Sequence, residues 1–323
     1  MRPTTAAATR SIITAASRSD RIKRLSEHLP VTRNVVQRFV PGETHEDVMG
    51  VGAALLNSGR MISIDHLGED TTDEGQAEHT VQAYLRLIGM LADHGAGPDP
   101  IPAGHPMEVS LKLSALGRSL PRYGEKIALE NAHRIASAAT SAGVWVTIDA
   151  EDHTTTDSTL RIVRELQSDF PDLGTVLQSY LHRTEDDCHA FAGPRSRIRL
   201  CKGAYAEPEA VAFQDKTEVD SAFQRCLQVL MAGDGYPMVA SHDPVMVAAA
   251  EAMADACGRG THEWEHQMLY GIRDSEQRRL AQAGRQIRVY VPFGSQWYGY
   301  FMRRLAERPE NLTFFLRALV SHN

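Results

Sequence analysis

The residues best suited to chemistry lie in the stretch YFMRRLAER, near the end of the chain. On a helix, four of them would share one face, because they are spaced at offsets of 0, 3, 4 and 7: Tyr300, Arg303, Arg304 and Glu307. Arginine presents a planar fork of N–H donors that fits a carboxylate bidentately. Two adjacent forks and a tyrosine could therefore bind one small carboxylate. The alternative is an exposed helix whose Glu307–Arg303 pair contributes only about 0.3–0.5 kcal/mol.

A second group of cations stands in RLCKGAYAEPE, at the end of an apolar segment. Gly203 and Ala204 would let a flat or phosphorylated ligand approach the backbone closely, and Arg199 and Lys202 could balance its charge. By itself this pattern is a weak indication of an anion site.

The stretch HEWEH matches the zinc-peptidase pattern H-E-x-x-H, with His262 and His266 as ligands and Glu263 as base. That chemistry needs a helix. On a strand the two histidines would lie roughly 13 Å apart, too far to share an ion that each ligand approaches to about 2 Å. The segment occupies the place of a strand and is flanked by glycines, so the zinc interpretation is kept only as an alternative.

Short apolar segments alternate with amphipathic ones from Gly59 onward, which predicts parallel strands joined by helical crossovers. Eight such units over about 250 residues predict a (βα)₈ barrel. The expected strands span residues 60–65, 107–116, 144–150, 175–181, 196–202, 236–241, 262–269 and 287–293.

The expected helices include residues 44–56, capped by Thr44, and residues 77–93, 124–142, 216–232 and 243–257. The predicted organisation is an N-terminal helical arm over residues 1–58 and a barrel domain over residues 59–323, ending in a lid-like C-terminal helix. A doubly wound open sheet is the alternative, but DHLGEDTTDEG does not supply its G-x-G-x-x-G turn.

Alternation within the strands predicts which side chains point into the barrel. In MEVSLKLSAL the aliphatic Val109, Leu111 and Leu113 would face the helices, while Lys112 shares the opposite face with two serines. Five polar residues would then stand toward the carboxyl ends of five strands, where barrel enzymes place their chemistry: Lys112, Asp149, Gln178, Arg199 and Tyr290. Lys112 is either a Schiff-base lysine or, more plainly, the ion-pair partner of Asp149.

Composition narrows the classes of function. The 323 residues carry a formal charge of -7, which argues against a dedicated nucleic-acid binder. No apolar run approaches the roughly 20 residues that span a bilayer. Four scattered cysteines fit reduced thiols of an intracellular protein. The Arg- and Ser-rich N-terminus weakly resembles a transit peptide, but a helical arm is the preferred interpretation.

Taken together, these segments resemble the proline dehydrogenase family in its short monofunctional form. The resemblance covers roughly residues 59–320 and rests on an ordered set of motifs: EVSLKLSALG, TIDAED, LQSYL, RLCKGAYAEPE, ASHD, EHQMLYGI, RVYVPFG and YFMRRLAERPEN. The family fold is a (βα)₈ barrel with noncovalent FAD, preceded by helices. The resemblance implies oxidation of L-proline to 1-pyrroline-5-carboxylate, with a hydride passing to flavin N5.

The resemblance also implies roles for individual residues. Asp149 and Arg199 are implied in the reaction, Asp149 as the strand-end aspartate that orients the arginine pair and Arg199 beside the reactive flavin nitrogen. The implied substrate-binding residues are Lys112, Leu269, Tyr290, Tyr300, Arg303 and Arg304. The implied flavin contacts are Ile148, Gln178, Arg199, Lys202, Gly203, Ala204, Ser241, His242, Gln267 and Glu307. No metal site is implied.

Some positions depart from the family pattern. Ala206 stands where a large or charged residue is common, Ser241-His242-Asp243 replaces Thr-His-Asn, and Tyr270-Gly271-Ile272 replaces His-Gly-Met. None removes a residue that the chemistry requires, although the first two could alter flavin affinity or redox tuning.

Two other interpretations stay open beside the zinc peptidase: a flavin dehydrogenase of another cyclic amino acid such as hydroxyproline, and a barrel that only binds ligands. The family expectation for the electron acceptor is a quinone, at a membrane surface that the protein would not span. The expected location is therefore the cytoplasm or the inner face of a membrane, on the mitochondrial matrix side if the protein is eukaryotic. No obligate protein partner is evident.

Overall fold

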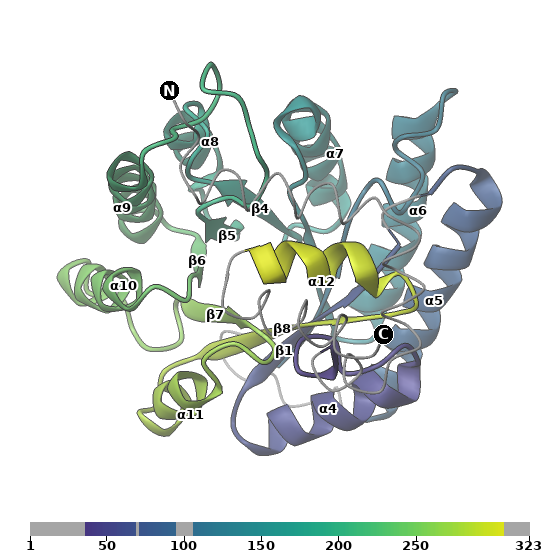
Figure 1. Ribbon diagram of the computed structural model, residues 1–323, viewed down its shortest axis with the longest axis horizontal. Coiled ribbons are helices and arrows are strands. Elements are labelled where there is room, and N and C mark those ends of the chain that lie inside the picture. Colours follow the sequence, from purple (N-terminus) through teal and green to yellow (C-terminus); the bar gives the residue numbers. More distant parts are fainter. Residues whose placement is uncertain (1–35, 69–70, 95–105, 307–323) are drawn as a thin grey trace, which may run out of the picture.

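The computed structural model describes residues 36–68, 71–94 and 106–306, without the side chains of residues 303–306. Its centre is a closed barrel of eight parallel strands in sequential order (Figure 1). The strands are β1 Met61–His66, β2 Met107–Leu111, β3 Trp145–Ile148, β4 Gly174–Gln178, β5 Arg197–Cys201, β6 Tyr236–Ala240, β7 Glu265–Leu269 and β8 Ile287–Phe293. All eight predicted strands are present, and the predicted barrel is confirmed.

The alternation of side chains explains how the barrel is filled. Val109 and Leu111 are fully buried in the apolar layer that joins the strands to the surrounding helices. Ser63 and Ser110 point into the barrel, where their hydroxyl oxygens lie 2.9 Å apart. The outer layer is thus the hydrophobic core, and the inside of the barrel is polar, as the sequence pattern predicts.

Helices surround the barrel: α4 precedes β1, and the others follow successive strands (Figure 1). They are α4 His45–Asn57, α5 Glu74–Asp93, α6 Gly124–Ser141, α7 Thr156–Asp169, α8 Thr184–Phe191, α9 Lys216–Ala232, α10 Pro244–Ala256 and α11 Asp274–Gln282, with a short 3₁₀ turn at His153–Thr155. Thr44 caps α4 in a reciprocal capping box with Asp47, which confirms the predicted cap. The predicted arm before residue 36 lies outside the described residues.

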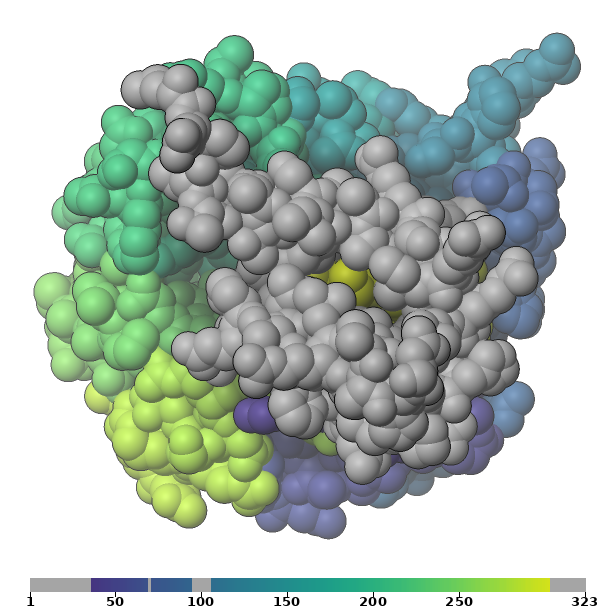
Figure 2. All heavy atoms as spheres, in the orientation of Figure 1, coloured from purple at the N-terminus to yellow at the C-terminus, as the bar shows by residue number. Residues whose placement is uncertain are grey.

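The last helix, α12 Trp297–Ala306, differs from the others in position. It follows the carboxyl end of β8 and lies across the end of the barrel, whereas α4 lies in the outer ring (Figure 1). In the space-filling view its yellow atoms are visible near the centre of this face (Figure 2). Tyr300 and Phe301 are both buried, so over this first part α12 is not the exposed surface helix that the alternative interpretation required.

The second strand is shorter than its apolar run predicts. Residues 107–116 are apolar enough to extend as one strand, but β2 ends at Leu111. The amide of Leu116 donates to the carbonyl of Leu113, and Gly117 has a φ of 102°, so the chain turns there. This turn leaves Lys112 at the open end of the barrel, one residue beyond the strand.

Two further expectations from the sequence concern the oxidation state of the cysteines and membrane-spanning segments. The four cysteines are all free thiols, with Cys188 and Cys226 buried and Cys257 exposed. Among the residues that the structure describes, no helix is both long enough and apolar enough to cross a membrane.

Candidate active site

Four of the five predicted strand-end residues meet at the carboxyl end of the barrel. Asp149 accepts hydrogen bonds from Arg199 Nη1 at 2.6 Å and from the Tyr290 hydroxyl at 2.7 Å. Lys112 Nζ donates to the same hydroxyl at 3.2 Å and lies 3.6 Å from the Asp149 carboxylate. The four side chains come from different parts of the barrel, and only its closure brings them together.

Gln178 is held elsewhere on the rim. It is the last residue of β4 and is buried, and its amide donates to the backbone carbonyl of Glu151 at 2.8 Å. It is therefore fixed in place but does not take part in the hydrogen bonds around Asp149.

Burial dominates the electrostatics of this group. It raises the pKa of the Asp149 carboxyl, while the positive charges of Arg199 and Lys112 oppose the rise. Burial also raises the pKa of Tyr290 well above its ordinary value, and the neighbouring Asp149 adds to that shift. Tyr290 therefore stays protonated, which lets its hydroxyl donate to Asp149.

Arg199 also hydrogen-bonds neighbours inside the barrel. Besides Asp149, it donates from Nε to the Gln267 side-chain oxygen at 2.5 Å and from Nη2 to Glu108 at 2.7 Å. Burial alone would lower the pKa of Arg199, but the carboxylates of Asp149 and Glu108 raise it. Its guanidinium lies 5.3 Å from the centroid of the Tyr290 ring. The Arg199 guanidinium, which is planar and permanently charged, is therefore fixed in position beneath the barrel mouth.

An apolar cluster lies next to this polar group. Three of the substrate-binding residues that the family resemblance implies, Leu269, Tyr290 and Tyr300, all pack in it. The cluster also includes Phe39 and Phe301, whose ring centroids are 6.1 Å apart. Helix α12 thus places an aromatic lid beside the charged residues of the mouth.

The arginine pair itself is described only in part. The backbone of Arg303 and Arg304 belongs to α12, but their side chains lie outside the described part of the structure, and so does the whole of Glu307. Their predicted roles stay predictions.

Five of the residues predicted to contact a flavin follow the ends of the neighbouring strands β5 and β6: Lys202, Gly203, Ala204, Ser241 and His242. Lys202 donates to Asp220 and, at 2.9 Å, to Asp243. The imidazole of His242 accepts from the backbone N–H of Leu269 at 2.9 Å. Asp243 also caps α10 through the amide of Val245 at 3.0 Å. The Asp that replaces the usual Asn therefore has two partners here, a lysine and a helix terminus.

The small residues beside Lys202 are explained by crowding. Gly203 has a φ of 117°, and a Cβ at this position would lie 2.2 Å from the Tyr180 ring. Only glycine fits this turn. Ala204 follows it, and Ser241 accepts from the amide of Asp243 at 3.2 Å. The loop after β5 is thus held against the rim.

The donor set suits a flavin. The mouth offers a guanidinium and an amide side by side, in Arg199 and Gln267, and a fixed lysine on the next loop at Lys202. These groups can bond the polar edge and the phosphates of such a cofactor. Ile148 is completely buried in the apolar layer that also contains helix residues. Its predicted contact with a flavin stays a prediction.

Two residues that sequence reasoning missed are central to the geometry. Asp65, the next-to-last residue of β1, pairs with Lys112 at 2.5 Å, closer than the predicted partner Asp149. Glu108 in β2 binds Arg199 from inside the barrel. Both are acids on strand faces that alternate with aliphatic residues. The same pattern that singled out Lys112 could have identified them.

The zinc alternative is contradicted by the local fold. β7 begins at Glu265, so the two histidines of HEWEH are not on one helix. His262 is exposed and its Nδ1 lies 3.1 Å from the Gln286 amide, whereas His266 is buried against Trp264. The described residues contain no group of His, Cys, Asp and Glu side chains that could hold a metal.

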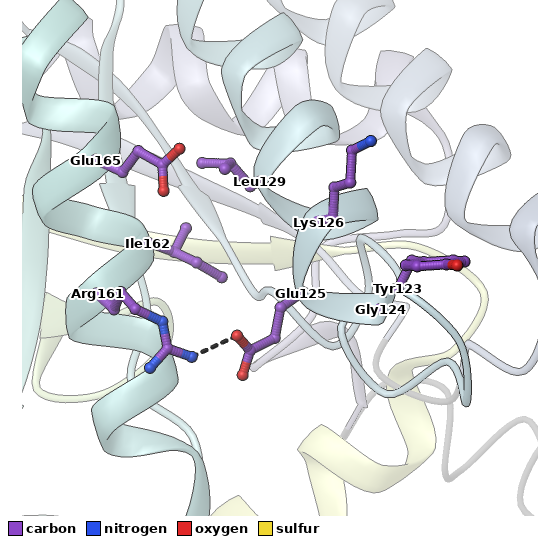
Figure 3. A pocket seen from close by; sticks show the side chains of 8 residues that line it. All are labelled: Tyr123, Gly124, Glu125, Lys126, Leu129, Arg161, Ile162 and Glu165. Carbon is purple, nitrogen blue, oxygen red and sulfur yellow. Dashed lines mark hydrogen bonds and ion pairs between the residues drawn. The ribbon is translucent and has the colours of Figure 1, made fainter.

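A surface pocket of about 470 Å³ lies away from the mouth, between α6 and α7 (Figure 3). Its lining includes the Glu125–Arg161 ion pair and the exposed Tyr123, and none of the predicted site residues. It therefore contributes nothing to the candidate active site.

Comparison with known proteins agrees with the geometry. The family model described as "Proline dehydrogenase" matches residues 50–317. The chain is 37% identical over 289 residues to "Proline dehydrogenase 1" of Bacillus subtilis (strain 168), covering 90% of this chain and 92% of that protein. It is 39% identical over 290 residues to "Proline dehydrogenase" of Deinococcus radiodurans, covering 89% and 90%.

A solved structure agrees in fold. Proline utilization A from Bdellovibrio bacteriovorus, inactivated by N-propargylglycine, superimposes with a TM-score of 0.78 at 23% identity over 90% of this chain. This chain spans only about a third of that much longer protein, 34% of its length. The likeness therefore supports the barrel, while the family model and the relatives of equal length show that this chain belongs to the proline dehydrogenase family.

Proposed function

We propose that the barrel mouth binds FAD and L-proline, and that the protein oxidises L-proline to 1-pyrroline-5-carboxylate. One observation carries the proposal: Lys112, Asp149, Arg199 and Tyr290 converge beneath an aromatic lid at the carboxyl end of the barrel. FAD, when bound, supplies the acceptor for the hydride that leaves the substrate carbon. No protein nucleophile is needed, so the side chains serve to bind, orient and exclude water.

Charged and apolar side chains of the mouth would contact different parts of the substrate. Lys112, with Arg303 and Arg304, would bind the substrate carboxylate, and Leu269, Tyr290 and Tyr300 would enclose the pyrrolidine ring. The apolar cluster that contains the last three supports this assignment, since it excludes water from one side of the mouth. Asp149 fixes Tyr290 and Arg199 through two short hydrogen bonds. The substrate would thus meet side chains that are already oriented.

Arg199 is the residue suited to stabilising negative charge on a reduced cofactor. Its guanidinium is buried and always charged, and its positive charge lies at the mouth rather than in solvent. Lys202, Gly203, Ala204, Ser241, His242 and Gln267 would hold the cofactor along the rim of β5–β7, with Gln178 and Glu307 as further contacts.

Electrons would pass from the reduced cofactor to a quinone at a membrane surface. This step is supported only by membership of the family. It can be tested by following the reduction of a soluble quinone analogue, with and without vesicles, while L-proline is oxidised.

The deciding experiment is an absorbance spectrum of the purified protein under anaerobic conditions, before and after L-proline is added. Flavin bands that bleach with L-proline are expected. Bleaching with hydroxyproline and not with L-proline would reassign the substrate. A colourless protein that gains no flavin on incubation with FAD would refute the proposal and leave a barrel that only binds ligands.

A further inference from the structure

Glu108 lies inside the barrel beneath the candidate active site, where the proposed chemistry does not reach it. It is completely buried. Its carboxylate accepts from Arg199 Nη2 at 2.7 Å, from the Ser63 hydroxyl at 2.7 Å and from Arg197 on its other side. A buried carboxylate with three strong donors is fixed in position.

Glu108 belongs to a hydrogen-bonded network of eight ionisable groups that fills this part of the barrel. The network joins four carboxylates to four cations: Asp65, Glu108, Asp149 and Glu265 with Lys112, Arg197, Arg199 and Arg288. Burial raises the pKa of Glu108, but Arg197, Arg288 and Arg199 outweigh it and hold the pKa well below its usual range. Glu108 is therefore ionised, and the network contains as many carboxyl groups as cationic side chains.

The position of Arg199 depends on carboxylates from two directions. Its Nη1 donates to Asp149 on the side of the mouth, and its Nη2 donates to Glu108 inside the barrel. The other acceptors on Nη2 are hydroxyls, Ser110 at 3.0 Å and Ser63 at 3.3 Å. Without Glu108, Asp149 on the mouth side would be the remaining carboxylate that accepts a printed hydrogen bond from Arg199.

We infer that Glu108 is a positioning residue for Arg199. It holds the guanidinium at a fixed depth and offsets part of its positive charge, and so sets the reduction potential of a cofactor bound above it. This inference rests on the proposed function, in which Arg199 faces the flavin. A negative charge beneath the cofactor disfavours the electron-rich reduced form, so removing it raises the potential.

Glu108→Gln alone leaves Arg197 without its carboxylate partner and can prevent folding, whereas Arg197→Met leaves Glu108 paired with Arg199 at 2.7 Å. The informative pair is Arg197→Met and the double variant Arg197→Met/Glu108→Gln, which differ only in the carboxylate beneath Arg199. Arg197 stacks 3.6 Å from the Trp145 ring centroid, and methionine keeps an apolar contact there. Glu151→Gln is the control, since Glu151 is a buried carboxylate that pairs with Arg118 at 2.7 Å outside the network.

The measurement is the two-electron midpoint potential of the flavin-loaded proteins, by spectroelectrochemistry. The double variant is expected to lie about 30 mV above Arg197→Met, a tenfold change in the equilibrium constant of a two-electron couple. The KM for L-proline should match between the two, because Glu108 acts on Arg199 and not on the substrate carboxylate. The control should keep the wild-type potential.

Three outcomes overturn the inference, and they are distinct. Equal potentials in two flavin-loaded variants show that Glu108 has no influence on Arg199. Loss of flavin from the double variant alone shows that Glu108 supports the cofactor site as a whole. A wild-type protein that binds no flavin refutes the proposed function itself, which the first two outcomes leave intact.

Discussion

Replacing Asp65 by asparagine tests how the mouth of the barrel is held together. Asp65 Oδ2 lies 2.5 Å from Lys112 Nζ, and the side chains are 1% and 10% exposed. Asparagine keeps the shape of the side chain and removes only its charge. Of the two carboxylate partners of Lys112 among the described residues, Asp149 at 3.6 Å then remains, and Arg199 already binds that carboxylate.

The geometry gives the size of the effect. Removing one partner of a buried ion pair costs about 3–5 kcal/mol, because the remaining charge is left without compensation. Asp149 still offsets part of the charge on Lys112, so we expect the lower end, about 3 kcal/mol. For a chain of this length each kcal/mol lowers the melting temperature by roughly 2 °C. The expected decrease is therefore roughly 6 °C.

The matched control makes the same chemical change at the surface. Asp172 pairs with Arg195 at 2.8 Å, but both side chains are more than half exposed. Such pairs contribute about 0–1 kcal/mol. Thermal and urea unfolding of Asp65→Asn and Asp172→Asn should differ clearly in midpoint. If the two variants unfold at the same midpoint, the Asp65–Lys112 pair does not stabilise the mouth and the reasoning fails.

Three further changes have defined outcomes. Burial lowers the pKa of His266 from 6.5 to about 4, so the unfolded chain binds this proton at a higher pH than the folded chain does, and stability is lost as the pH falls from 6.5 toward 4. His266→Leu should therefore make the urea midpoint depend less on pH over that range. An unchanged pH dependence contradicts this prediction. Gly203→Ala forces a Cβ into the Tyr180 ring and should lower both stability and flavin content. The control is Gly143→Ala, also at positive φ but in open space, which should lower the free energy of unfolding by only about 1 kcal/mol and keep the flavin. Similar losses in both variants would refute the crowding argument. Arg304→Met should raise the KM for L-proline at least tenfold with flavin still bound, measured by steady-state kinetics, and an unchanged KM would show that this arginine does not bind substrate.

Much of the barrel follows from side-chain periodicity. Alternation of polar and aliphatic residues identified the strands, and it placed Lys112 and Asp149 on inward faces toward the carboxyl ends. The overlong second strand was wrong because apolarity continues past Leu111, while the turn that stops the strand is set by backbone hydrogen bonds ending at Gly117. Periodicity reports which face a residue takes, but not where pairing ends.

The partners inside the barrel could not be predicted, since they depend on the stagger between strands. Asp65 lies opposite Ser110 in the β1–β2 register, which brings its carboxylate to Lys112. Glu108 reaches Arg199 across the barrel from β2 to β5. Such distances follow from the tilt and shear of the closed barrel. The stagger between strands cannot be read directly from the amino-acid sequence.

The seam that closes the barrel has a consequence for biosynthesis. Met61 of β1 pairs with Arg288 of β8, which lies 227 positions later in the chain. Until the last strand leaves the ribosome, β1 and β7 both present bare backbone donors and acceptors at the two margins of an unfinished sheet, where other chains can add. A released chain that ends before Ile287 should therefore depend on chaperones, whereas a released chain that ends just after Phe293 already has every strand it needs to close the barrel.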